Sequence, residues 1–97
     1  MFRPLNPLLH SQLRLAVMSI LMSVAEADFV YLKEKTASTA GNLSVQLDKL
    51  LTAGYITMSR INAGRNQRTT LRITPLGQEA FEEYVEALQD YIRGKEE

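Results

Sequence analysis

The fold of this chain is decided by the segment Thr39-Ala-Gly-Asn-Leu-Ser-Val-Gln-Leu-Asp-Lys-Leu-Leu-Thr-Ala53 and the two short runs that follow it. Its leucines share roughly a quarter of a helix circumference, which is the pattern of a helix with one buried face. Those leucines are Leu43, Leu47, Leu50 and Leu51. Thr39 or Ser38 suits the N-cap, and Gly54 suits the left-handed residue that closes a helix. The sequence therefore predicts a helix over 39–53 with a polar face opposite the leucines.

The next segment changes its period from that of a helix to that of a strand. Apolar and polar residues alternate in 56–61 and again in 68–74, as they do in half-buried strands. Asn62, Gly64 and Asn66 lie between the two runs and supply turn chemistry. We therefore expect a β-hairpin over 56–74.

Three further helices complete the prediction. A stripe of apolar residues at three- and four-residue steps predicts a helix over 11–25, and residues 1–10 form an arm or a turn before it. Asp28 suits the N-cap of a helix over 28–35, and Thr74-Pro75 opens a last helix over 75–93. The expected fold class is mainly α with a small β-hairpin (α+β), in the order α-α-α-β-β-α.

Composition limits what the chain can do. Its 97 residues, of which 45% are apolar, suffice for one domain over 1–97. Without cysteine it has no disulfide and no thiolate metal site, and its single histidine, His10, has no cluster of ligands near it in the sequence. No signal peptide or membrane span is recognisable. We expect a cytoplasmic protein that is not an enzyme and has no cofactor or metal.

The net charge of zero conceals an asymmetry along the chain. Residues 56–74 contain four arginines and no acid, whereas residues 75–97 contain seven acidic residues against two basic ones. We expect the basic hairpin and the acidic last helix to face different partners.

Several short motifs in this order resemble one family. They are His10-Ser-Gln-Leu-Arg-Leu-Ala16, Gly41-Asn-Leu-Ser-Val-Gln-Leu-Asp-Lys-Leu50, Ala53-Gly-Tyr-Ile56, Gly64-Arg65 and Arg68-Thr-Thr-Leu-Arg-Ile-Thr-Pro-Leu-Gly77. The chain resembles the bacterial and archaeal single-domain winged helix-turn-helix transcriptional regulators, which are MarR-, ArsR- or PadR-like, and most closely their minimal winged-helix DNA-binding family. The resemblance implies a third helix in the major groove and a hairpin, the wing, on the adjacent minor groove or backbone. Ala40 departs from the acidic residue usual there, and Val45 from a longer polar one.

The polar face of the third helix carries the candidate contacts to bases. Asn42 and Gln46 have amides that match adenine in bidentate fashion, while Val45 suits a thymine methyl. Ser44 suits a base or a phosphate, and Lys49 suits the backbone. The full set of helix candidates is Thr39, Asn42, Ser44, Val45, Gln46 and Lys49. For any one of these residues, the alternative is a solvated position on an exposed helix face.

The arginines of the hairpin are the candidate contacts to phosphate and the minor groove. Arg65 and Arg68 flank the expected tip, and Arg65 is the strongest single candidate. Arg60 and Arg72 lie further down the strands. For these two, a plain surface charge or a salt bridge to the acidic last helix is an equal alternative. The wing candidates for DNA binding are Arg60, Arg65 and Arg68.

The last helix carries an apolar stripe that is wide for a small monomer. The stripe predicts a dimerisation surface formed by Phe81, Tyr84, Val85, Leu88, Tyr91 and Ile92. The alternative is that this helix packs wholly within its own chain, against the first helix. A small-molecule effector, if there is one, would bind between the dimer helices and the DNA-binding part, beside Met18, Met22, Phe29, Tyr31 or Tyr84.

The predicted function is therefore sequence-specific binding of double-stranded DNA by a homodimer that regulates transcription as a repressor. The alternative is a winged-helix module for protein–protein interaction that does not bind DNA, which the zero net charge, Ala40 and Asp48 favour. The four arginines of the wing favour DNA.

Overall fold

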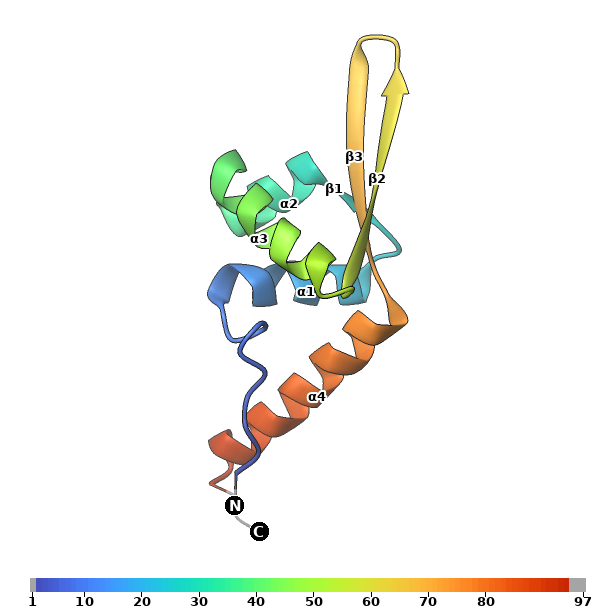
Figure 1. Ribbon diagram of the computed structural model, residues 1–97. Helices are drawn as coiled ribbons and strands as arrows, with labels where there is room; N and C mark the ends of the chain where they lie inside the picture. Colours follow the sequence, from blue (N-terminus) through green and yellow to red (C-terminus); the bar gives the residue numbers. More distant parts are fainter. Residues whose placement is uncertain (1, 95–97) are drawn as a thin grey trace.

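The computed structural model describes residues 2–94, apart from the side chains of residues 63 and 66. Along the chain the elements are α1 (Gln12–Ser23), β1 (Ala27–Asp28), α2 (Phe29–Thr36), α3 (Ala40–Thr52), β2 (Ile56–Ala63), β3 (Asn66–Ile73) and α4 (Pro75–Ile92). The three N-terminal helices form one layer beside the base of a long hairpin, and α4 runs away from them at the opposite end (Figure 1). The α+β winged-helix fold class expected from the sequence is confirmed.

The sheet has three antiparallel strands in the order β1-β3-β2. β2 and β3 pair along their whole length, from Ile56 opposite Ile73 to Ala63 opposite Asn66. β1 adds only two residues, with Ala27 opposite Leu71 and Asp28 opposite Thr70. β1 was absent from the sequence prediction, because two residues are too few to show a strand period.

The observed boundaries differ from the expected ones in two places. α1 ends at Ser23 rather than near residue 25, with an extended residue, Val24, after it. The strands of the wing are longer than expected, so the turn shrinks from 62–67 to Gly64-Arg65. Gly64 has φ +63°, which allows so tight a turn. Because the flanking asparagines pair within the ladder, they are strand residues and not turn residues.

Side chains cap three of the helices. Asp28 Oδ1 accepts from Tyr31 N at 2.7 Å at the start of α2. Thr39 Oγ1 accepts from Asn42 N at 3.2 Å at the start of α3. Thr74 Oγ1 accepts from Gly77 N at 3.0 Å at the start of α4. Each cap satisfies a backbone donor that the first turn of a helix leaves unpaired.

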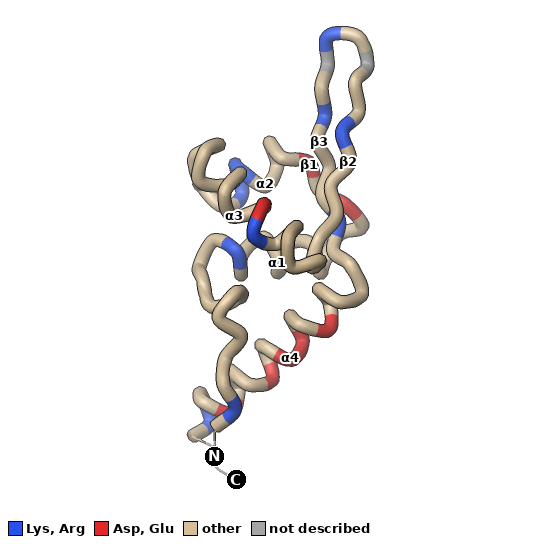
Figure 2. Tube along the Cα trace, viewed as in Figure 1, with Lys and Arg blue, Asp and Glu red and all other residues tan. Residues whose placement is uncertain are grey.

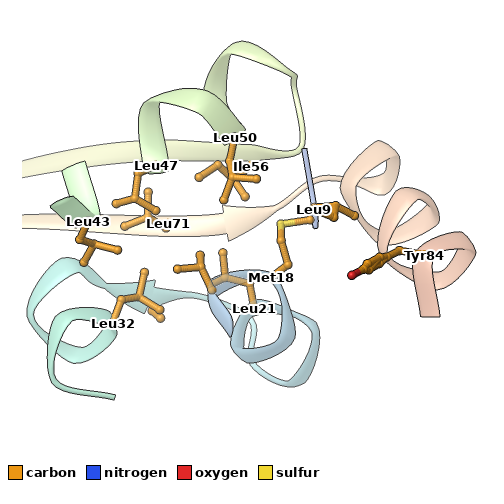
Figure 3. Close-up of a cluster of buried hydrophobic side chains, with 12 residues drawn as sticks. Leu9, Met18, Leu21, Leu32, Leu43, Leu47, Leu50, Ile56, Leu71 and Tyr84 are labelled. Carbon is orange, nitrogen blue, oxygen red and sulfur yellow. The ribbon is translucent and has the colours of Figure 1, made fainter. Parts of the chain in front are cut away.

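The core lies where α1, α2 and α3 meet the base of the wing. α3 contributes Leu43, Leu47 and Leu50, which point toward Leu71 of β3 and Ile56 of β2 (Figure 3). The other large side chains buried there are Leu9, Val17, Met18, Leu21, Leu32 and Tyr84. The leucine face of α3 is thus fixed in the core, which leaves the opposite face on the surface.

Two motifs far apart in the sequence interlock at the base of the wing. Thr74 N donates to Tyr55 O at 2.9 Å, and Thr74 Oγ1 donates to Gly54 O at 2.7 Å. Gly77 lies so close that a Cβ atom there would be 2.1 Å from Tyr55 O. Gly54 itself has φ +78°, the left-handed conformation expected after α3. The Gly54-Tyr55 and Thr74-Gly77 pairs therefore fasten the end of α3 to the start of α4.

The N-terminal arm, residues 2–10, runs beside α4 (Figure 1). Phe2 stacks on Tyr91 with ring centroids 4.7 Å apart, and Tyr91 Oη donates to Arg3 O at 2.7 Å. The Arg3 guanidinium lies 3.2 Å from a carboxylate oxygen of Glu86 and 3.2 Å from one of Asp90. Much of one side of α4 is therefore covered by the arm of the same chain.

Candidate nucleic-acid interface

The face of α3 opposite its leucines is exposed. Asn42 and Lys49 are exposed there, Val45 is 52% exposed, and Ser44 is exposed on the flank nearer the wing. Asp48 shares this face and places one negative charge on it. Thr39 is also exposed, but its hydroxyl caps α3, so it already has a structural role. Among the described contacts, Ser44, Val45 and Lys49 take part in no side-chain hydrogen bond, whereas the side-chain oxygen of Asn42 already accepts one from Gln46.

Gln46 differs from the other candidates because it is half-buried and hydrogen-bonded at both ends of its amide. Arg14 Nη1 donates to Gln46 Oε1, and Gln46 Nε2 donates to Asn42 Oδ1 at 3.1 Å. Sequence reasoning missed Arg14, which interrupts the apolar pattern of α1. A cation amid an apolar stripe was the available signal, but its partner is 32 positions away along the chain.

The four arginines of the wing fall into two pairs. Arg72 Nη2 lies 2.5 Å from Glu26 Oε1, and Arg68 Nη2 lies 3.4 Å from Asp28 Oδ2. Arg60 and Arg65 are exposed, and neither takes part in an ion pair among residues 2–94. The salt bridge considered for Arg72 therefore exists, but its partner precedes β1 and is not in the acidic last helix.

Arg60 lies close to the exposed face of α3 that carries Asn42, Val45 and Lys49, which we call the reading face. It lines a groove of about 330 Å³ together with Ser44 and Asp48 of α3 and Met58 of β2. Arg65 lies at the tip of the wing, beyond the helices. One cation of the wing thus lies beside α3 and another at its tip.

The charge asymmetry of the sequence becomes an asymmetry in space. Basic residues mark the wing, while acidic residues follow α4 at the other end of the molecule (Figure 2). The molecule measures 57 × 25 × 21 Å, so the two ends are separated along its long axis. A polyanion would be attracted to the end formed by α3 and the wing and repelled by the α4 end.

The six residues predicted for dimerisation are divided between two stripes of α4. The first stripe comprises Ala80, Tyr84, Ala87 and Tyr91, at steps of three and four residues. Tyr84 is only 4% exposed, its hydroxyl lies 2.9 Å from His10 Nδ1, and Tyr91 stacks on Phe2. Tyr84 and Tyr91 are therefore engaged within their own chain, which corrects the single wide stripe that the sequence suggested.

The second stripe comprises Phe81, Val85, Leu88 and Ile92. Phe81 packs against the core, and Val85 and Leu88 are half-buried. Ile92 is 75% exposed. α4 is therefore not wholly covered by its own chain, and the second stripe remains open toward its C-terminal end.

The structure does not gather the residues considered for an effector site. Met18 is fully buried in the core and Tyr84 is buried against the arm. Phe29 lines two grooves beside the wing, neither of which is lined by Met22, Tyr31 or Tyr84. Within one copy of the chain these residues thus lie in different surroundings, and an effector crevice shared with a second copy stays a prediction.

The described part of the chain holds neither a cluster of metal ligands nor a membrane-spanning helix. Residues 2–94 contain no group of three or more His, Cys, Asp or Glu side chains arranged to hold a metal ion. In the same residues, no helix has both the length and the apolar character needed to cross a bilayer.

Comparison with known proteins agrees with this geometry. Residues 13–92 match the family model described as a winged helix DNA-binding domain. The chain is 32% identical to Uncharacterized protein MJ0432 of Methanocaldococcus jannaschii over 76 residues, which cover 78% of this chain and 83% of that protein.

Solved structures share the fold. A transcriptional regulator homologue from Pyrococcus horikoshii is 28% identical, with a TM-score of 0.84 over 90% of this chain and 86% of its own. Bacillus subtilis PadR, solved in complex with operator DNA, is 17% identical, with a TM-score of 0.67 over 77% of this chain and 47% of its own. The resemblance to small winged-helix regulators is therefore confirmed, and the chain belongs to the winged helix DNA-binding domain family.

Proposed function

We propose that this protein is a sequence-specific regulator of transcription that binds double-stranded DNA as a homodimer. The observation that carries the proposal is that the exposed face of α3 and the wing with its basic residues lie at one end of the molecule, away from the acidic α4 (Figure 2). The function of its structural neighbour PadR, which was solved with operator DNA, is consistent with this use of the fold.

In this proposal α3 enters the major groove with its N-terminal half toward the base edges. Asn42, Ser44 and Val45 are the residues that reach bases, and Lys49, one turn further along, meets the backbone. Arg65 at the tip of the wing follows the negative potential of the adjacent minor groove. Arg60, between α3 and the tip, contacts the phosphates that separate the two grooves.

The second stripe of α4 is the proposed dimer contact, and its occupant is a second copy of the chain. Val85, Leu88 and Ile92 form an apolar row on a helix that also exposes four glutamates, so a copy of the same row is the complementary surface. The reading face of α3 is short and carries Asp48, which makes binding by one copy weak. Two copies related by a twofold axis would read a palindromic site.

Repression needs no surface beyond the one that binds DNA, because a bound dimer occludes the promoter it covers. We therefore propose repression rather than activation. A chromosomal DNA partner also implies a cytoplasmic protein. This function is one of binding, and no residue is assigned a catalytic role.

Replacing Arg65 with alanine tests the proposal directly. Loss of one phosphate contact should reduce the slope of log K against log salt concentration by about one unit for each subunit. Fluorescence anisotropy with a mixed-sequence duplex at several salt concentrations measures this slope. The control is Arg72→Ala, because Arg72 is held by Glu26 and should leave the slope nearly unchanged although the same charge is removed.

Equal slopes for the wild-type protein and both variants would show that Arg65 does not meet phosphate. Absence of salt-sensitive binding by the wild-type protein would contradict DNA binding altogether. That second result would favour a winged-helix module for protein–protein interaction.

A further inference from the structure

Arg14 joins the N-terminal arm to the reading helix. It is half-buried on α1, where its Nε donates to Leu8 O at 2.6 Å and its Nη1 donates to Gln46 Oε1. Two separate donors of one planar guanidinium are thus engaged with two different segments. A group held at two points has little freedom to turn, so the position of Gln46 is set by α1 and the arm.

The chemistry of the guanidinium fixes the orientation of the amides beyond it. Arginine has donors and no acceptor, so Gln46 must turn its oxygen toward Arg14 and its nitrogen away. Gln46 Nε2 then donates to Asn42 Oδ1 at 3.1 Å, one helical turn nearer the N-terminus of α3. Asn42 in turn has its oxygen directed toward Gln46, and its NH₂ group is the end left for other partners.

We propose that Arg14 is a positioning residue that, through Gln46, leaves the donor end of the Asn42 amide free, and that guanine is the base selected opposite Asn42. This inference rests on the proposed function, since it assumes that α3 reads DNA. It deepens that function by naming the base class and the residue that sets it. Arg14 itself touches no base in this account.

The choice of guanine follows from the pattern of groups in the major groove. An amide with both ends available matches adenine, which offers the N7 acceptor and the N6 donor. Here the Asn42 oxygen is turned toward Gln46 and already accepts one hydrogen bond, so its NH₂ group is the free end of the amide, and guanine offers that group two acceptors, N7 and O6. The adenine contact expected from the sequence is thereby disfavoured, and cytosine, whose N4 group is a donor, is disfavoured most.

Selection from a random duplex pool, followed by sequencing, tests the base preference. The base position that loses its preference in Asn42→Ala is the one opposite Asn42. In the wild-type protein we expect guanine there, favoured over adenine on the order of tenfold. Replacing that guanine with 7-deazaguanine, which lacks the N7 acceptor, should weaken binding of the wild-type protein.

Arg14→Met is the central variant, because it keeps the aliphatic stem and removes every donor. Gln46 can then turn over, so the preference for guanine over adenine should fall to about twofold or reverse. The salt slope should stay as in the wild-type protein, since Arg14 meets no phosphate. Arg14→Lys retains a donor for Gln46 and should restore part of the guanine preference.

A double-mutant cycle shows whether Arg14 acts through Gln46. In a Gln46→Ala background, Arg14→Met should change the base preference no further. The network is also observable without DNA. The side-chain amide signals of Gln46 and Asn42 in ¹⁵N–¹H spectra should shift in Arg14→Met. They should stay in place in the control Arg3→Met, because Arg3 pairs with Glu86 and Asp90 of α4 and not with α3.

Four outcomes would overturn the inference. They are adenine opposite Asn42 in the wild-type protein, an unchanged guanine preference in Arg14→Met, a reduced salt slope in that variant, or unmoved Gln46 and Asn42 signals. The first three presuppose salt-sensitive binding, so they leave the proposed function standing. Absence of binding by the wild-type protein would remove both.

Discussion

Gly77→Ala is expected to lower the free energy of unfolding by about 3 kcal/mol, the upper part of the range for an atom forced into a filled space. A Cβ at this position would lie 2.1 Å from Tyr55 O and 3.0 Å from Ile73 Cγ1. The carbonyl cannot move away freely, because it accepts the hydrogen bond from Thr74 N that fastens α4 to the end of α3. Urea denaturation followed by circular dichroism measures the loss.

Gly41→Ala is the matched control. Gly41 also lies in the first turns of a helix, but nothing stands within 4 Å of the position its Cβ would take. That change should be neutral or stabilise the protein by up to about 1 kcal/mol, because alanine favours the helix. If Gly77→Ala lowers the free energy of unfolding no more than Gly41→Ala does, the close approach of Gly77 to Tyr55 O is contradicted.

Leu88→Glu is expected to convert the proposed dimer to a monomer and to weaken binding to a palindromic site on the order of a hundredfold. Leu88 lies in the middle of the second stripe of α4, and a carboxylate there would face its counterpart across the twofold axis. The variant should stay folded, because Leu88 lies outside the main core. Light scattering reports the mass, and titration with a selected palindrome reports the affinity.

Gln89→Glu adds the same charge to an exposed neighbour on the same helix, and it should leave both mass and affinity nearly unchanged. If the wild-type protein is already monomeric at micromolar concentration, or if Leu88→Glu remains dimeric, α4 is not the dimer contact.

Local signals explain what the sequence predicted about the fold. Caps act within three or four residues, so Asp28, Thr39 and Thr74 could be recognised as helix starts from their neighbours alone. The leucines of α3 repeat at helical steps, so their burial was also predictable. The short strand β1 was not, because its pairing with Leu71 and Thr70 spans more than forty positions.

The candidate site was harder to predict because its decisive contacts are not local. The apolar positions of α4 read as one wide stripe, yet the arm that covers Tyr84 and Tyr91 comes from the other end of the chain. Gln46 looked like a free amide on a helix face. Its engagement by Arg14 depends on how α1 crosses α3, which no spacing within either helix reveals.

The wing is attached to the rest of the protein only at its base. Its base is held by β1 at Leu71 and Thr70 and by the Thr74 hydrogen bonds to Gly54 and Tyr55, whereas β2 and β3 pair on to the Gly64-Arg65 turn as a two-stranded ribbon. A ribbon of two strands twists more strongly than a wider sheet. The proposed contact of Arg65 with the minor groove would therefore be made from the part of the wing that the core holds least, so it would place little demand on how the core and α3 sit.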